Sequence, residues 1–163
     1  MLNNSYSVDK NLFVFVQRRA LRLMYEKLSS LDAQELSRDK ALQLLESLLE
    51  QLPVSMKNIE KNREQIHNVQ HLMLAFKGCF KFLNENDSKH DNEMELLSLM
   101  LKKILNFTES IHVERKRSIE IEDKSLSNLK GSCLICLVQV LCSMTADGIQ
   151  FIGQVVNLLL NNF

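Results

Sequence analysis

The stretch Glu64–Leu83, EQIHNVQHLMLAFKGCFKFL, decides the fold class of this 163-residue chain. Its apolar side chains recur every three or four residues, which is the spacing of one face of an α-helix. The apolar positions are Ile66, Val69, Met73, Phe76, Phe80 and Leu83. We therefore expect a helix whose apolar face packs into a core.

The same spacing predicts five more helices and three polar connectors between them. The expected helices are Asp9–Leu28, Gln34–Gln51, Asn92–Phe107, Lys124–Met144 and Ala146–Asn161. Pro53 would end the second of them. The expected connectors are Met56–Arg63, Asn84–Asp91 and the charged stretch Thr108–Asp123. The chain is thus predicted to be all-α, with about six main helices.

Each predicted helix has an expected buried stripe. In the first helix it comprises Phe13, Val16, Ala20, Met24 and Leu28. In the second and fourth it comprises Ala41, Leu44, Leu45, Leu48, Leu52, Leu96, Leu97, Met100, Ile104 and Phe107. In the sixth it comprises Ile149, Ile152, Val155, Val156 and Leu159. The fifth is apolar almost all round, so we expect it to lie between neighbouring helices.

Composition agrees with long helices and few tight turns. The chain has one proline and four glycines, whereas turn-rich β architectures need many more of both. Its formal net charge of zero argues against a dedicated nucleic-acid module, which usually carries a basic excess, although a local basic patch remains compatible with it.

The cysteines and the N-terminus favour an intracellular protein. Cys79, Cys133, Cys136 and Cys142 lie in apolar stretches, and residues 1–11 lack the apolar region of a secretory signal. The longest apolar run, near Cys133–Cys142, is interrupted by Gln139 and is short for a bilayer span. We expect no membrane partner.

No motif predicts catalysis, a cofactor or a small-molecule substrate. The chain lacks a nucleophile elbow, a glycine-rich phosphate loop and a Walker-type lysine. The Cys133–Cys136 pair has CxxC spacing but no second pair, so buried structural thiols are expected rather than a metal site. His67 and His71 are four residues apart without an HExxH motif, and a metal role is not expected there. A small helical enzyme or metal protein built on these residues remains the alternative from another class.

Three segments carry a resemblance to HEAT-repeat proteins. They are VQRRALRLMYEKL at Val16–Leu28, VQHLMLAFKGCFKFL at Val69–Leu83 and NLKGSCLICLVQVLCSMTADGIQFIGQVVNLLL at Asn128–Leu160. The first looks like the second helix of a HEAT repeat, and the chain as a whole is similar to the C-terminal region of the large HEAT-repeat family of the small-subunit processome. The resemblance implies an α–α solenoid of HEAT-like helical hairpins.

The resemblance also implies a function. It predicts a non-catalytic scaffold of the nucleus and nucleolus that acts in pre-rRNA transcription and in processing of the small-subunit precursor. Its partners would be protein subunits of a large ribonucleoprotein assembly, with pre-ribosomal RNA or U3 small nucleolar RNA as a further contact. The alternative is another HEAT-type protein-binding scaffold, such as a transport receptor or a DNA-repair platform.

Residues 1–163 are expected to form one helical-repeat domain. A complete solenoid carries polar faces at its ends, whereas apolar residues crowd the C-terminus of this chain. These residues are Leu158, Leu159, Leu160 and Phe163. We therefore expect the domain to be a fragment of a longer solenoid.

One basic set is the candidate contact surface. It comprises Arg18, Arg19, Arg22 and Lys27 on the first predicted helix. Guanidinium groups there would hold phosphate or an acidic peptide. The alternative is a solvated face that pairs with Glu26 and nearby acids. The shorter basic run Arg115–Arg117 lies in the predicted connector.

Overall fold

The computed structural model describes the backbone of residues 2–56, 63–83, 91–117, 123–144 and 149–160. It describes the side chains of residues 12–56, 65–83, 92–111, 125–144 and 151–160, with the exception of Leu159. Those residues form helices and turns without a strand, so the all-α prediction is confirmed. The helices are α1 Leu2–Ser30, α2 Arg38–Leu49, α3 Arg63–Phe80, α4 Asp91–Arg117, α5 Asp123–Ser143 and α6 Ile149–Leu160.

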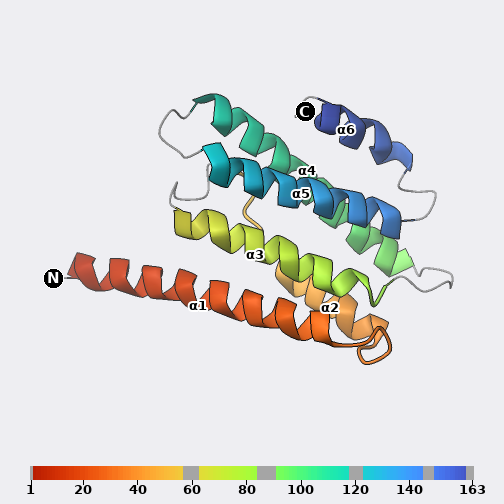
Figure 1. Cartoon of the computed structure of the whole chain (residues 1–163), viewed down its shortest axis with the longest axis horizontal. Helices are drawn as coiled ribbons and strands as arrows, with labels where there is room; N and C mark the ends of the chain where they lie inside the picture. Colours follow the sequence, from red (N-terminus) through yellow and green to blue (C-terminus); the bar gives the residue numbers. More distant parts are fainter. Residues whose placement is uncertain (1, 57–62, 84–90, 118–122, 145–148, 161–163) are drawn as a thin grey trace.

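The helices are arranged in two layers (Figure 1). The helices α1, α3 and α5 lie side by side in the front layer, with α3 in contact with both of its neighbours. The helices α2 and α4 lie behind them, in contact with α3 and α5 respectively and with one another. The last helix, α6, packs against α5.

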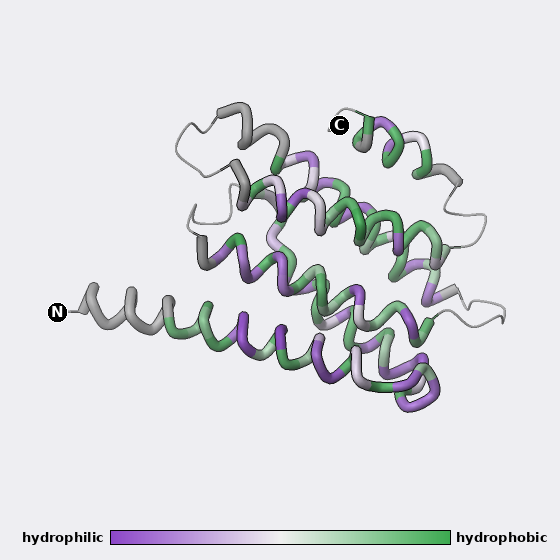
Figure 2. The backbone as a smooth tube through the Cα atoms, in the orientation of Figure 1, coloured by the Kyte–Doolittle hydropathy of each residue, from purple (hydrophilic) through white to green (hydrophobic). Residues whose placement is uncertain are grey.

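The central helix α3 is buried on more than one face. The predicted stripe is confirmed, because all six of its side chains are buried. Leu72, Ala75 and Cys79, on a different face of the same helix, are buried as well. Figure 2 shows hydrophobic residues alternating with hydrophilic ones along α3. Three neighbours, α1, α2 and α5, cover α3 and account for this burial.

Helix α2 begins four residues later than predicted. Ser37 has extended backbone angles, and its hydroxyl accepts a hydrogen bond from the backbone N–H of Lys40 at 3.4 Å. A serine in this position satisfies a backbone donor at a helix start, which explains why the helix begins at Arg38. The preceding residues form a turn in which the Glu35 carboxylate accepts from the Asp32 N–H at 2.6 Å.

The predicted connector Thr108–Asp123 is wrong over its first half, because α4 continues to Arg117. Thr108 and Ile111 are fully buried, and the Thr108 hydroxyl donates to the Ile104 carbonyl at 2.6 Å. The core therefore extends one helical turn beyond Phe107. The many charged residues of this segment led to the incorrect prediction of a loop. The predicted connectors 56–63 and 84–91 lie mostly outside the described residues.

The predicted stripe of α1 is wrong in its first half. The side chains of Phe13 and Val16 are 66% and 55% exposed, and Ala20 is exposed too, whereas Leu21 and Leu28 are buried. Residues 12–16 are apolar throughout, so periodicity alone allows more than one stripe. Docking against α3 selects the face that contains Leu21 and Leu28.

The stripe of α6 is also only partly correct. Val155 is buried as predicted, but Ile152 and Val156 are exposed. The buried partners of Val155 on this helix are Phe151 and Leu158. The predicted members Ile149 and Leu159 have side chains outside the described part of the chain. The stripes of α2 and α4 are confirmed, with Leu44 and Leu96 half-buried.

Helix α5 packs against α3, α4 and α6, in agreement with the prediction that it lies between neighbours. The longer stretch Ser125–Ser143 of this helix, which contains the run Cys133–Cys142, would suffice by length and composition alone to cross a membrane. In the structure 44% of that stretch is buried against other helices. A core helix of this kind meets the same criterion.

A buried ion pair joins α2 to α4. The Arg38 guanidinium donates to the Glu93 carboxylate, whose side chain is 1% exposed. Arg38 Nε and Glu93 Oε1 are buried, and neither has a hydrogen-bond partner among the described groups. Removal of one member of such a pair leaves the other as an uncompensated buried charge.

We expect Leu137→Asp to disrupt the packing of α5, since Leu137 is fully buried and the new carboxylate would have no partner. The expected loss of unfolding free energy is about 4 kcal/mol or more, measured by urea denaturation. Ile135→Asp is the matched control on the same helix, where the side chain is 56% exposed. Normal unfolding of the Leu137 variant would contradict the core assignment.

Arg38→Met should destabilise the fold by about 3–5 kcal/mol, because it leaves Glu93 charged and buried. The double variant Arg38→Met/Glu93→Leu should recover most of that loss, because it removes both charges. Chemical denaturation of the wild type, both single variants and the double variant gives the coupling free energy. Equal instability of the double and single variants would show that packing, rather than charge, explains the loss.

Candidate partner-binding groove

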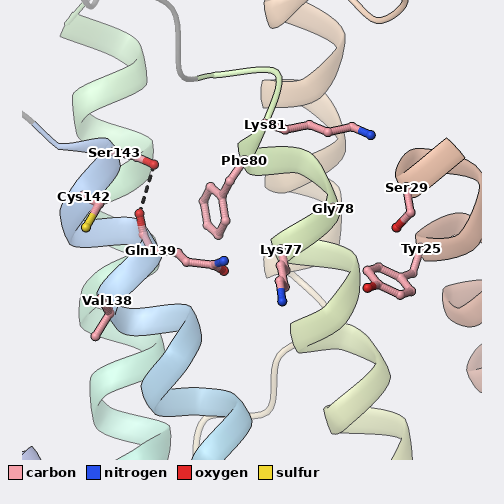
Figure 3. Close-up of a pocket in the computed structure, with 10 residues that line it drawn as sticks. All are labelled: Tyr25, Ser29, Lys77, Gly78, Phe80, Lys81, Val138, Gln139, Cys142 and Ser143. Atoms are coloured by element: carbon pink, nitrogen blue, oxygen red, sulfur yellow. Dashed lines mark hydrogen bonds between the residues drawn. The ribbon is translucent and has the colours of Figure 1, made fainter. Parts of the chain in front are cut away.

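A groove crosses the front layer between the C-terminal halves of α1, α3 and α5 (Figure 3). Its volume is about 460 Å³, which lies within the range of ligand-sized hollows. The lining residues are Tyr25, Ser29, Lys77, Gly78, Phe80, Lys81, Val138, Gln139, Cys142 and Ser143. The groove is thus built by three helices that are separated in sequence.

Gly78 sets the distance between α1 and α3 beside the groove. A Cβ atom at this position would lie 3.1 Å from Leu28 Cβ and 3.3 Å from Leu28 Cδ1. That spacing is tighter than ordinary van der Waals contact, so glycine permits the close approach of Leu28. By contrast, a Cβ atom at Gly131 of α5 would have no heavy atom within 4 Å.

Two lysines, one helical turn apart, border the groove. Lys81 Nζ donates to the Leu31 carbonyl, just beyond the end of α1, and lies 5.1 Å from the centroid of the Phe82 ring. Lys77 is exposed, and Figure 3 shows it directed into the groove. Lys81 therefore holds a helix end, whereas Lys77 offers its charge to the groove.

The amide of Gln139 extends towards Lys77 from the opposite wall (Figure 3). Its Oε1 atom is buried and has no hydrogen-bond partner among the described groups. Its own backbone carbonyl accepts from the Ser143 hydroxyl at 3.0 Å. A buried amide oxygen without a hydrogen bond lowers the free energy of unfolding by about 1–3 kcal/mol. Rotation of the amide would let this oxygen accept a hydrogen bond from a donor in the groove.

The basic set of α1 is divided by the structure. Arg18 and Arg22 share a helix face with the groove residues Tyr25 and Ser29, because these positions are three or four residues apart. Arg19 and Lys27 point to other faces of the helix. Two of the four predicted contact residues thus extend the groove surface along α1.

The local partners of this basic set are on α1 itself. Arg22 Nε donates to Glu26 Oε1 at 3.1 Å, with both side chains well exposed, so the predicted Glu26 pairing is present for this arginine. Arg18 lies 5.9 Å from the centroid of the Phe15 ring. An exposed pair at this spacing contributes only a few tenths of a kcal/mol, so a partner would displace it readily.

Bases predominate among the described side chains of the front layer. The described side chains of α1, α5 and residues 65–83 include seven bases and one carboxylate, Glu26. The bases are Arg18, Arg19, Arg22, Lys27, Lys77, Lys81 and the buried Lys130. The described side chains of α2 and α4 include four bases and five carboxylates. Within the described part of the chain, the front layer is therefore basic, whereas the back layer is nearly balanced.

A second hollow continues the groove along α3 and α5. Its volume is about 60 Å³, and it shares Lys77 and Gln139 with the first. Its other lining residues are Met73, Leu74, Ser132, Ile135 and Cys136. Neither hollow is lined by a carboxylate. The combined surface has apolar walls, both aliphatic and aromatic, and a cation, Lys77, that is common to both hollows.

The residues considered for metal binding are engaged elsewhere. Cys133 and Cys136 are buried free thiols, and His71 Nδ1 donates to the His67 carbonyl at 2.7 Å. Burial raises the pKa of Cys133 to about 12, against a smaller opposing effect of its hydrogen bond with Thr108. Among the described residues no three His, Cys, Asp or Glu side chains gather around a common point.

Sequence reasoning missed Lys77, Lys81 and Gln139. The two lysines are four residues apart and fall outside the apolar stripe of α3, which was an available signal for a basic face. No signal linked them to Gln139, because only packing of α5 on α3 brings it near.

Comparisons of the chain with protein-family models, with curated proteins and with solved structures give no match.

Alkylation should separate the four cysteines in the folded protein. Cys142 is exposed, whereas Cys79, Cys133 and Cys136 are buried. Burial raises the pKa of Cys79 to about 12, so at pH 8 it carries about a thousandfold less reactive thiolate than a thiol of pKa 9.0. We expect iodoacetamide to modify Cys142 first, as read by peptide mass spectrometry. Rapid modification of Cys133 would contradict the core.

Proposed function

We propose that this chain is a non-catalytic scaffold that binds macromolecular partners through its α1–α3–α5 layer. The observation that carries the proposal is the excess of bases in that layer, with seven bases, one of them the buried Lys130, and one carboxylate among its described side chains. A surface of one sign attracts partners of the opposite sign and speeds their association. The partners expected for it are acidic proteins and nucleic acids.

The arrangement of helices supports a repeat scaffold. Helices of one layer pack consecutively, α1 on α3 and α3 on α5, and α2 contacts α4 in the other. Stacking of successive hairpins in this way is the principle of a solenoid, where each unit buries its face against its neighbours. We therefore propose an α–α solenoid of HEAT-like hairpins.

The resemblance of Val16–Leu28, Val69–Leu83 and Asn128–Leu160 to processome HEAT helices supplies the cellular setting of the proposal. On this basis the scaffold acts in the nucleolus, within the ribonucleoprotein assembly that transcribes and processes the small-subunit precursor. Protein subunits of that assembly are the proposed partners, and pre-ribosomal RNA or U3 small nucleolar RNA is the proposed nucleic-acid contact.

Immunoprecipitation of the tagged chain from eukaryotic cells tests this proposal. We expect enrichment of U3 small nucleolar RNA and of the small-subunit precursor over U1 small nuclear RNA. Reversal of three exposed bases, Arg19→Glu, Arg22→Glu and Lys27→Glu, should abolish most of that enrichment, because binding to phosphate depends on cationic contacts.

The matched control reverses three exposed lysines of the other layer, Lys40, Lys102 and Lys103, to glutamate. It changes the net charge by the same amount, so it should leave the enrichment unchanged if the front layer is the contact. Equal recovery of U1 and U3 RNA, together with a location outside the nucleolus, would overturn the proposed setting. Equal losses in both triple variants would instead assign the effect to net charge alone.

A further inference from the structure

We propose that the groove across α1, α3 and α5 binds an acidic amphipathic helix of a partner protein. This inference rests on the proposed scaffold function and adds the chemical class of its partner. The occupant would place apolar side chains against the apolar walls of the groove and a carboxylate beside Lys77.

Helix α5 supplies exposed apolar surface to the groove. Ile135 and Val138 are 56% and 41% exposed, although both belong to the most apolar segment of the front layer. They line the two joined hollows, together with half-buried Leu74 of α3. Burial of this aliphatic surface is favourable in proportion to the apolar area removed from water.

Helices α3 and α1 supply positive charge in and beside the groove. Lys77 is common to both hollows and lines the groove (Figure 3), whereas Lys81, just beyond the end of α3, is hydrogen-bonded to the Leu31 carbonyl. Arg18 and Arg22 follow on the same face of α1 as Tyr25. Since no carboxylate lines either hollow, a basic partner would find no counter-charge there, whereas an acidic one meets complementary charge along the groove.

The length and apolar lining of the groove suit a helical peptide. Along α5 the lining extends from Ser132 to Ser143, which corresponds to about 16 Å or about three helical turns. The walls at Leu74, Ile135 and Val138 are aliphatic, and the rings of Tyr25 and Phe80 add further apolar surface. Apolar grooves of this kind accept residues spaced three and four apart on a partner helix.

Selection from a displayed library of random peptides of about twelve residues would test the inference, with the purified full chain as bait. We expect enrichment of sequences with leucine-like residues at helical spacing and with a net negative charge. Counter-selection against Lys77→Glu protein isolates those that need the groove. Enrichment of basic peptides, or of no common pattern, would overturn the proposal.

A selected peptide, synthesised with a fluorescent label, then gives the affinity. Lys77→Glu should weaken binding about tenfold, equivalent to about 1.4 kcal/mol, and replacement of the peptide's glutamates by lysine should restore binding to that variant. Lys103→Glu on α4 is the matched control and should bind as the wild type does. Circular dichroism of both variants confirms that the fold is retained.

Two measurements locate the bound peptide and distinguish a failure of the groove assignment from a failure of the proposed nucleolar setting. A bound peptide should slow alkylation of Cys142, which lines the groove, and a twelve-nucleotide oligouridine should not displace it. Unchanged Cys142 reactivity, or displacement by the oligouridine, would overturn the groove assignment even if the immunoprecipitated assembly is intact. If the peptide binds but immunoprecipitation does not recover the nucleolar assembly, the groove assignment is supported and the proposed nucleolar setting is refuted.

Discussion

The burial of α3 is the constraint on which the rest of the described structure depends. This helix contacts α1, α2 and α5, and its largest side chains, among them Phe76 and Met73, are buried. Two neighbours in its own layer and one in the layer behind leave it a single narrow exposed strip. The residues on that strip include the exposed Lys77 and the half-buried His71 and Leu74. The same packing that stabilises the fold therefore creates the floor of the groove.

A close approach brings α1 and α3 together near their C-terminal ends. At Gly78 the absence of a side chain lets the buried Leu28 approach α3 closely. With Leu28 on the buried face of α1, Arg18, Arg22, Tyr25 and Ser29 lie beside the groove, while Phe13 and Val16 face away from the core. Polar contacts secure the same interface nearer its N-terminal end, where Asn68 Nδ2 donates to Gln17 Oε1 at 2.9 Å and Gln17 Nε2 donates to Gln51 Oε1 at 2.8 Å.

The back layer differs from the front in how its polar groups are used. Glu93 is buried and bonded to Arg38, so the charge that joins α2 to α4 is internal. The other described carboxylates of α2 and α4 are exposed, as are the lysines Lys40, Lys102 and Lys103 on the same two helices. The buried thiols of Cys79, Cys133 and Cys136 have raised pKa values because burial disfavours the thiolate. Their folding contribution is therefore present below about pH 9 and declines as the pH rises towards about 12, because the unfolded thiols ionise first.

The sequence by itself determined the all-α class, the number of main helices and the inward stripe of α3, because apolar residues at a spacing of three and four have few other ways to be buried. It also identified Arg18 and Arg22 as members of a basic face. It failed at Phe13, Val16, Ile152 and Val156, where a helix is apolar on more than one side and only its neighbour decides which side is covered. Only the tertiary structure decided that α4 extends beyond Phe107, because Thr108 and Ile111 are buried against other helices. Only the tertiary structure also placed Lys77 and Gln139 in the same groove. Contacts between helices that are far apart in sequence depend on packing angles and close approaches such as Gly78 on Leu28, and local periodicity carries no information about them.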